Sequence, residues 1–402
     1  MSAPEKLPVV VLKPRRALPF FSQHPWVFAG AIGSVSGRPD VGTEVIVRSH
    51  EGKFIARGLF NPHSNIRVRL YRWEEQDGLD EEFWRARVRS AVQLRQKLFA
   101  GTPTEKACRL IFSEADGLSG LTVDRVNDWL VVQWTSAALH RFQQPILDEL
   151  QALLAPKGIW LRTEKGIKIQ EGLEIEDGLL SGDVPPSSLV IEENGLQLAV
   201  DLQAGQKTGF YYDQRENRRV MADYVQGGRV LDMFCYSGAF ALSAAKLGQA
   251  RDVVAVDSSN SALELARRNA ELNGIADRIT FHCDDAFEFL DAQVEAGEKY
   301  DVIILDPPKL ARSRSGLERA AKAYVRLNQL AMKALNPDGI LMTCSCSGHV
   351  QREDFQQIIA RASLECGRRV QILEERGQAP DHPVSVNCLE TSYLKCILCR
   401  VE

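Results

Sequence analysis

The spacing of hydrophobic and polar positions changes along the chain, and each change predicts a different kind of structure. Short apolar runs broken by Gly, Pro, Asn or Ser fill residues 8–73, a pattern typical of a small all-β barrel. Residues 79–99 then show the apolar spacing of one amphipathic helix, which we expect to connect two domains. Strands and a helix near 139–154 follow, up to a turn-rich boundary at 181–188.

After about residue 190, strands alternate with helices, which is the signature of a parallel α/β sheet. Two last extended runs, 368–376 and 391–401, have only a loop between them and are predicted to form an antiparallel hairpin at the sheet edge. The chain is therefore predicted to hold three domains. They are a β-barrel over 1–75, a connector helix with a central α+β domain over 76–188, and an α/β domain over 189–402.

Charge is unevenly distributed along the 402 residues. The whole chain has 49 Lys/Arg and 53 Asp/Glu, a net −4. Residues 1–73 carry eleven basic and four acidic residues, a net +7, which leaves 38 basic against 49 acidic residues, a net −11, for the remainder. A basic end on an acidic body indicates a localised contact with a polyanion such as nucleic acid. The alternative is that these charges only keep the protein in solution.

Other features bear on location and metals. No run of about 18 apolar residues exists, and the N-terminus lacks the long apolar core of a signal peptide. The nine cysteines do not form the paired CxxC spacing of a zinc site, so no metal is expected. We expect a cytoplasmic protein with reduced thiols and no membrane contact.

Acidic residues end three successive predicted strands of the α/β domain. The loop 232–238 follows one strand and opens a helix, with Gly238 allowing close approach of a ligand to free N–H groups. Asp257 ends the next strand, where an acid can bind ribose hydroxyls, and Asp285 ends the third, where an adenine amine would lie. This acid-rich loop with a single glycine resembles motif I of class I S-adenosylmethionine (SAM) methyltransferases. The alternative is a plain α/β sheet with capping acids.

The fourth and fifth strands end in residues suited to base methylation. Asp-Pro-Pro-Lys at 306–309 resembles the Asp-Pro-Pro-aromatic motif of amine methyltransferases, but Lys309 replaces the aromatic residue. Carbon 5 of a pyrimidine needs a thiolate on carbon 6 before it can attack a methyl group. Cys346 and Cys344 are both candidates, two residues apart on a predicted strand and therefore on one face. The alternative for each is a small apolar residue in a buried strand.

The segment before the first strand of this domain, residues 203–218, packs glycine, polar groups and aromatics into a short loop. A helix is predicted to begin near Asp213, with Asp213 as its N-cap and Arg215 in the first turn. The functional interpretation is a lid over a cofactor. The other interpretation is an ordinary capped entry into a helix.

Taken together, the motifs at 206–215, 232–238, 306–309 and 345–348 resemble the bacterial ribosomal RNA large-subunit methyltransferase I (RlmI) family, whose members make 5-methylcytosine. Residues 23–30 and 58–64 resemble that family's PUA domain, an RNA-binding β-barrel. Residues 114–125, 379–384 and 393–395 are also similar to the family, so the resemblance covers nearly the whole chain.

The resemblance implies a PUA β-barrel, a small central α+β domain and a Rossmann-like class I methyltransferase domain. It implies methyl transfer from SAM to carbon 5 of a cytosine in large-subunit (23S) rRNA, with Cys346 as nucleophile. Asp306 fits a role at the Watson–Crick edge of the base, where it would hold the protonated N3 that forms as carbon 6 is attacked. Other RNA 5-methylcytosine methyltransferases carry a second cysteine after the proline of the motif at 306–309; here Lys309 follows Pro308, so the base for product release stays unnamed. The implied cofactor site comprises Gln203, Thr208, Phe210, Arg215, Asp232, Phe234, Ser237, Gly238, Asp257, Ser258, Asp284, Asp285 and Asp306.

The expected partner is large-subunit rRNA, with a homodimer of the chain as a further expectation. Trp26, Phe28 and Phe54 are candidates for stacking on RNA bases, although barrel packing is expected for at least two of them. Two other functions stay open. One is a purine-nitrogen rRNA methyltransferase, which needs no nucleophilic cysteine. The other is a non-catalytic ribosome-assembly factor that binds SAM as a ligand.

Overall fold

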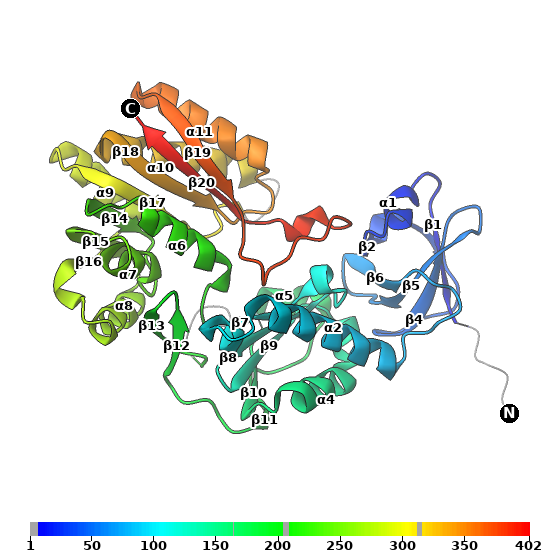
Figure 1. The fold of residues 1–402 in the computed structure, drawn as a ribbon. Helices are drawn as coiled ribbons and strands as arrows, with labels where there is room; N and C mark the ends of the chain where they lie inside the picture. Colours follow the sequence, from blue (N-terminus) through cyan, green and yellow to red (C-terminus); the bar gives the residue numbers. More distant parts are fainter. Residues whose placement is uncertain (1–6, 164, 204–208, 312–315) are drawn as a thin grey trace. The chain divides into compact units, whose positions relative to one another are not determined.

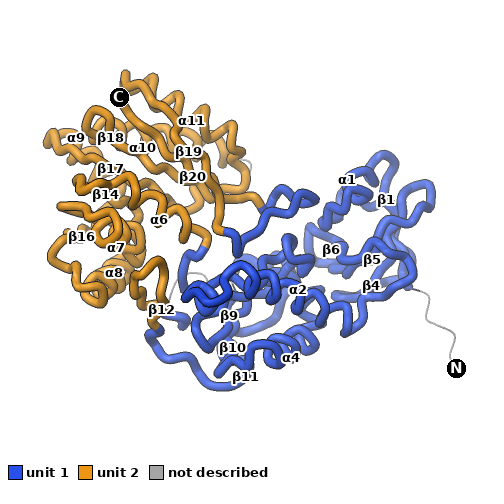
Figure 2. Tube along the Cα trace, in the orientation of Figure 1, with its two compact units in different colours: residues 1–189, 201–212, 380–391 blue, residues 190–200, 213–379, 392–402 orange. Residues whose placement is uncertain are grey.

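The computed structural model describes residues 7–163, 165–203, 209–311 and 316–402. The chain forms two compact units, coloured separately in Figure 2. Unit 1 comprises 1–189, 201–212 and 380–391, and unit 2 comprises 190–200, 213–379 and 392–402. Neither unit is a continuous stretch of sequence, because the chain passes from one to the other repeatedly.

Unit 1 begins with a six-stranded sheet whose strand order is β2-β6-β5-β4-β1-β3 (Figure 1). Its core is formed by every second side chain along a strand. On β4, Val45 and Val47 are fully buried while their neighbours are half-buried. The elements are β1 (Val9–Leu12), α1 (Leu18–Phe21), β2 (Trp26–Phe28), η1 (Ala29–Ala31), β3 (Ile32–Val35), β4 (Glu44–Arg48), β5 (Phe54–Phe60) and β6 (Ile66–Arg72).

The rest of unit 1 is an α+β region around a second sheet of order β11-β10-β9-β8-β7. The helix predicted over 79–99 is confirmed as α2 (Glu81–Phe99), and its N-cap Asp80 accepts a hydrogen bond of 2.8 Å from Phe83 N. The other elements are η2 (Pro103–Lys106), β7 (Ala107–Phe112), η3 (Ser113–Asp116), β8 (Leu121–Val126), β9 (Trp129–Trp134), α3 (Ala137–His140), α4 (Gln143–Leu154), β10 (Gly158–Leu161), α5 (Lys165–Glu171) and β11 (Gly178–Gly182).

The barrel and the α+β region share buried contacts, which explains why they form one unit. Tyr71 of the barrel packs edge-on against Trp84 of α2, with ring centroids 4.9 Å apart, inside one hydrophobic core. Arg69, also from the barrel, is buried and lies 3.3 Å from Glu114 and 3.4 Å from Glu171. A charge buried in this way needs its partners, so separating the two regions would leave ions unpaired.

Unit 2 contains the hairpin β12-β13 and a seven-stranded sheet of order β16-β15-β14-β17-β18-β20-β19. The predicted alternation of strands and helices is confirmed, as is the antiparallel pairing of the last two strands, with β19 at the edge. The elements are β12 (Leu189–Glu193), β13 (Leu196–Val200), η4 (Tyr212–Gln214), α6 (Arg215–Asp223), β14 (Arg229–Met233), α7 (Ala239–Lys246), β15 (Asp252–Asp257), α8 (Asn260–Leu272), η5 (Ala276–Arg278), β16 (Ile279–Cys283), α9 (Ala286–Glu295), β17 (Tyr300–Leu305), α10 (Leu317–Ala334), β18 (Leu335–Ser345), α11 (Arg352–Cys366), β19 (Val370–Arg376), η7 (Leu389–Thr391, in unit 1) and β20 (Lys395–Val401).

The strand order of this sheet positions the site. β14 pairs in parallel with β15 on one side and with β17 on the other, so the order of connection reverses at β14. Ligands of open α/β sheets bind beyond the carboxyl ends of the strands at this reversal. The loops that follow β14, β15, β17 and β18 meet there. Among the helices of the described residues, none has the length and apolar character needed to cross a membrane.

Candidate active site

The loop 232–238 after β14 has an unusual backbone. Phe234, Tyr236 and Gly238 have positive φ angles of 64°, 49° and 78°, a region that bulky residues rarely adopt. At Gly238 a Cβ atom would also lie 2.9 Å from the Leu242 side chain and 3.1 Å from Ala266, so glycine permits α7 to start close to α8. Such strain at a strand end persists only where the surroundings hold it, and it is common at ligand sites.

Asp232 lies at the end of β14 and is buried. Its Oδ2 accepts a hydrogen bond of 2.9 Å from Ala241 N, near the start of α7, while its Oδ1 has no partner among the described residues. Burial raises the pKa of Asp232 well above its usual value, and the carboxylates of Asp306 and Asp257 act in the same direction. A cationic ligand among these three carboxylates would relieve their repulsion.

Asp257, at the end of β15, connects the neighbouring loops. Its Oδ2 accepts a hydrogen bond of 2.9 Å from Tyr236 N, and its Oδ1 accepts one of 2.9 Å from Ser259 N. The first bond supports the strained loop 232–238 directly. Each oxygen retains a second lone pair for a ligand hydroxyl.

The other predicted cofactor residues at this edge have structural contacts of their own. Asp285 is exposed and is the N-cap of α9, where its Oδ1 accepts from Phe287 N at 2.8 Å and Glu288 N at 3.3 Å. Asp284 accepts from Asp285 N at 2.8 Å. Ser237 is buried, and its carbonyl accepts from Asn269 at 3.0 Å, whereas Ser258 is exposed. These residues follow the strands that the sequence indicated, and their ligand contacts stay predictions.

The loop at 306–309 lies next to the loop at 345–348. β17 and β18 pair in parallel, with Leu305 opposite Thr343, so their ends coincide. Asp306 is half-buried, and Cys346 Sγ lies 3.9 Å from the carbonyl oxygen of Pro307. The structure thus brings together the two motifs that the sequence associated with base chemistry.

The two candidate thiols differ in their surroundings. Cys344 is fully buried on β18 opposite Cys396 of β20. The neighbouring Cys396 thiol and burial raise the pKa of Cys344 well above its usual value, so this thiol stays protonated. Cys346 is half-buried. The strand ends at Ser345, so the strict alternation assumed from the sequence stops before Cys346.

Two residues that the sequence reasoning did not single out contact the loop of Cys346. Tyr324 of α10 is buried, and its OH lies 3.3 Å from Ser347 Oγ. Lys395 of β20 is also buried, and its Nζ donates to the Ser347 carbonyl at 2.7 Å. Lys395 had appeared in the sequence only as part of the family-like stretch 393–395, without a role. Tyr324 gave no signal, because it lies on the apolar face of an ordinary amphipathic helix.

The segment 203–218 is divided between the units. Gln203 and Phe210 belong to unit 1, where Gln203 Nε2 donates to Pro185 O at 2.9 Å and Phe210 packs 5.2 Å from the Tyr212 ring. Thr208 lies outside the described residues. Arg215 belongs to unit 2, where its Nε lies 3.7 Å from Glu193.

The prediction that Asp213 caps the following helix is wrong. α6 begins at Arg215 with Gln214 at its N-cap, and no side chain caps it. A 3₁₀ turn at Tyr212–Gln214 precedes the helix, and the Asp213 carboxylate accepts a hydrogen bond from the Tyr393 hydroxyl instead. A partner far along the chain therefore outcompetes the local cap.

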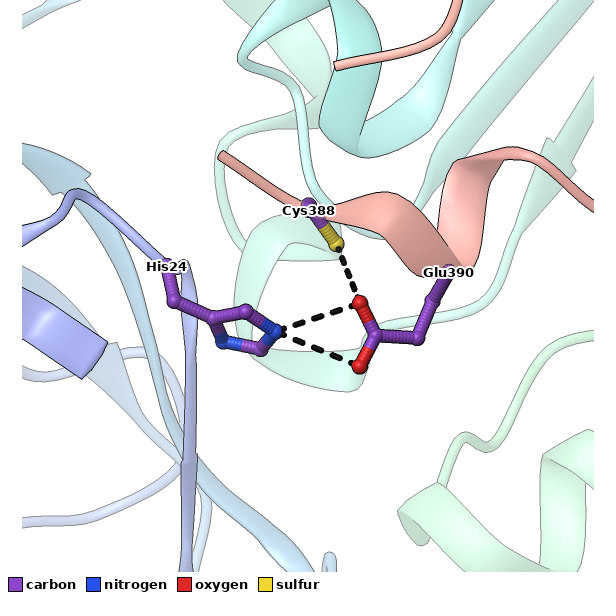
Figure 3. A group of neighbouring side chains, drawn as sticks. All are labelled: His24, Cys388 and Glu390. Carbon is purple, nitrogen blue, oxygen red and sulfur yellow. Dashed lines mark hydrogen bonds and ion pairs between the residues drawn. The ribbon is translucent and has the colours of Figure 1, made fainter. Parts of the chain in front are cut away.

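Unit 1 has a separate cluster of polar side chains, formed by His24, Cys388 and Glu390 (Figure 3). His24 Nδ1 accepts a hydrogen bond of 3.3 Å from Trp26 N, which leaves the ring proton on Nε2, 3.3 Å from Glu390 Oε2. Cys388 Sγ donates to the same carboxylate at 3.5 Å, and burial raises the pKa of this thiol. Within unit 1, the contact between His24 and Glu390 links the segment 380–391 to the N-terminal sheet.

Comparison with known proteins identifies the class. A family model described as S-adenosylmethionine-dependent methyltransferase matches residues 128–391, and a PUA-like domain matches residues 10–73. A SAM-dependent methyltransferase structure from Streptococcus mutans has a TM-score of 0.84 at 19% identity, covering 98% of this chain and 99% of that one. The structure of the methyltransferase SMU.776 complexed with SAH has a TM-score of 0.85 at 19% identity with the same coverage. At this identity, the two structures show the fold alone.

The parallel α/β sheet and the loop 232–238, together with the family matches, define a class I SAM-dependent methyltransferase preceded by a PUA-like domain, as predicted. SAM is its cofactor. Ribosomal RNA large subunit methyltransferase I of Salmonella typhi is 42% identical over 395 residues, covering 98% of both chains. This chain belongs to the ribosomal RNA large subunit methyltransferase I family. The carboxylates of Asp232, Asp257 and Asp306 fit SAM, because its sulfonium and ammonium groups are cationic and Asp232 Oδ1 is buried without a partner.

Proposed function

We propose that this protein transfers a methyl group from SAM to carbon 5 of a cytosine in large-subunit ribosomal RNA. The observation that carries the proposal is the half-buried thiol of Cys346, which lies 3.9 Å from the Pro307 carbonyl at the sheet edge that we propose binds SAM. The relative from Salmonella typhi, named ribosomal RNA large subunit methyltransferase I, supports the choice of rRNA as substrate.

The chemistry follows from the reactivity of cytosine. The Cys346 thiolate adds to carbon 6, and the resulting enamine-like carbon 5 becomes nucleophilic. SAM supplies the methyl group for carbon 5. Loss of the carbon 5 proton to a base then expels the thiolate. Asp306 supports the addition, because a carboxylate at the Watson–Crick edge stabilises the protonated N3 that forms as carbon 6 is attacked.

The structure favours Cys346 over Cys344 as nucleophile. Cys344 is fully buried, and the raised pKa of its thiol opposes thiolate formation. Cys346 is partly exposed and follows the strand end, where a base can reach it. Cys344 lies inside the stretch of β18 that pairs with β20, from Gly339 to Ser345, whereas Cys346 lies beyond it.

RNA carrying 5-fluorocytosine tests the proposal. Its carbon 5 carries fluorine in place of hydrogen, so after methyl transfer there is no proton for the base to remove, and the covalent adduct persists. We expect a stable protein–RNA adduct whose crosslinked peptide contains Cys346, and no adduct with Cys346→Ala. The Cys344→Ala variant serves as the matched control and should still form the adduct. Methylation of RNA without any adduct would favour the purine-nitrogen reaction. SAM binding without methyl transfer to any RNA would favour an assembly factor.

The basic N-terminal part is proposed to bind the RNA backbone. Lys13, Arg15, Arg16 and Lys53 are exposed around α1, while Arg69 is buried in ion pairs and is unsuitable for RNA. Of the three aromatics, Phe28 is 42% exposed and is the best candidate for base stacking. Trp26 instead donates its indole N–H to Glu114 at 3.0 Å, and Phe54 is half-buried.

Because Arg69 links the barrel to the rest of unit 1, substitutions test this role better than deletion of residues 1–73. We expect the double variant Arg15→Gln, Arg16→Gln to lower the dependence of log K on log salt by roughly one to two. The exposed Arg361→Gln on α11 is the control and should leave the slope unchanged. An unchanged slope in the double variant would contradict the proposed contact. Association into a homodimer stays a prediction.

A further inference from the structure

Lys395 is a buried lysine at the start of an apolar strand. Its relative exposure is 4%, although lysines are almost never buried without a partner. Its Nζ donates to two backbone carbonyls, Ser347 O at 2.7 Å and Tyr393 O at 2.8 Å. Within the part of the chain that the structure describes, no carboxylate forms an ion pair with it. A cation in this position is costly unless an anion nearby compensates it.

The carbonyl that Lys395 binds belongs to the residue after Cys346. Ser347 is held on every side: its Oγ accepts from Ala311 N at 3.2 Å and contacts Tyr324, and its N donates to Ser345 Oγ at 3.4 Å. Ser345 in turn lies directly opposite Lys395 in the β18–β20 ladder. The residues on both sides of Cys346 are therefore fixed, and the lysine is part of what fixes them.

The charges around this lysine show which anion compensates it. Burial lowers the pKa of Lys395 to about 8, and the Cys346 thiolate is the largest influence that opposes this fall. The positive charges of Arg352 and Lys309 lower the pKa of Lys395 further, whereas the negative charge of Asp354 raises it. Cys346 and Asp306 also raise the pKa of the Tyr324 hydroxyl, so both groups lie within electrostatic range of Tyr324.

We propose that Lys395 is a positioning residue for Cys346, with its ammonium serving as the counter-charge of the catalytic thiolate. The thiol proton passes to solvent water, and Lys395 keeps its own protons and its charge. The proposal rests on the assignment of Cys346 as nucleophile under the proposed function. It gives the thiol at the end of the strand a cation that favours its ionised form.

Alkylation of the full-length protein by iodoacetamide, without RNA, tests the pair. The rate for the Cys346 peptide is followed by mass spectrometry from mildly acidic to mildly alkaline pH, and its midpoint gives the thiol pKa. We expect a wild-type midpoint below about 8.5, the value of a free cysteine. Lys395→Met and Lys395→Gln should each raise it by about one pH unit or more. The exposed Lys322→Met on α10 is the control and should not move it.

The Lys395→Gln variant separates charge from position, because glutamine keeps an N–H donor for the Ser347 carbonyl but carries no charge. A change in the plateau rate with an unmoved midpoint would mean that Lys395 only holds the loop, and the proposal would be wrong. Melting curves identify a variant that fails to fold, and the other variant then decides. If the midpoint depends on Lys395 but no fluorocytosine adduct forms, the cytosine chemistry is wrong and the charge pair of Lys395 and Cys346 stands. If the adduct forms but the midpoint does not depend on Lys395, the cytosine chemistry stands and the charge pair is wrong.

Discussion

The loops at 232–238 and 345–348 follow strands of one sheet, yet groups of opposite charge hold their backbones. In the first loop, the Asp257 carboxylate accepts the Tyr236 N–H at 2.9 Å. In the second, the Lys395 ammonium donates to the Ser347 carbonyl at 2.7 Å. Each anchor also sets the local charge, so that the first loop is acidic and the second is basic.

This difference suits what each loop has to hold. A sulfonium cofactor is stabilised among carboxylates, whereas a thiolate needs a cation beside it. Had the acidic anchor stood at the second loop, it would have kept the Cys346 thiol protonated. One sheet edge therefore carries two separate electrostatic environments, because the loops after β14 and β18, which have β17 between them, are held by different anchors.

The largest expected effect lies at the basic loop. Cys346→Ala should lower methyl transfer by several orders of magnitude while SAM and RNA still bind, because the pathway through carbon 6 is lost. Single-turnover transfer of labelled methyl groups measures this, with melting curves to confirm folding.

Cys344→Ala provides the comparison and should keep substantial activity. A dead Cys344→Ala together with an active Cys346→Ala would keep the mechanism and reverse the assignment. If both single variants are active, the double variant decides whether one thiol replaces the other. An active double variant would remove thiolate chemistry altogether.

The acidic loop should respond in cofactor affinity. Asp257→Ala should weaken SAM binding by roughly 1.5–3 kcal/mol, the range for a hydrogen bond to a charged group, because it removes an acceptor for the ribose and the support of Tyr236 N. Calorimetry measures the affinity. The exposed Asp277→Ala is the control for the loss of one negative charge. An unchanged affinity in folded Asp257→Ala would exclude this role.

Asp285 should give the smallest effect, and it separates a structural from a ligand role. Asp285→Ala should cost about 0.5–2 kcal/mol of unfolding free energy, because α9 loses its N-cap. Asp285→Ser keeps a capping oxygen, so stability should recover while SAM affinity falls by a few-fold through the lost contact with adenine. Urea unfolding and calorimetry on both variants measure this. Wild-type SAM affinity in Asp285→Ser would leave Asp285 as a cap alone.

The sequence predicted those parts of the molecule that depend on local pattern. The alternation of strands and helices located Asp232, Asp257 and Asp306 at strand ends, because parallel strands of one sheet end at one edge. The two last extended runs were correctly paired. These features follow from period and order along the chain, and both are visible without knowing the contacts.

What the sequence did not predict depends on partners far apart in the chain. Asp213 was expected to cap α6, but its carboxylate binds Tyr393, 180 residues later. Lys395 appeared only within the family-like stretch 393–395, and its place beside the Cys346 loop depends on its pairing opposite Ser345 of β18. Cys344 and Cys346 looked equivalent until the pairing of β18 with β20 buried one of them.

The position of β20 has a consequence for how this protein is made. The strand inserts between β18 and β19, although both precede it in the sequence. Before residues 395–401 are available, β18 and β19 each lack the strand that pairs with them in the finished sheet, and such unpaired edges invite aberrant pairing. The incomplete chain also lacks the lysine beside Cys346. A product that ends before residue 395 is therefore expected to be prone to aberrant pairing and to lack the counter-charge proposed for Cys346.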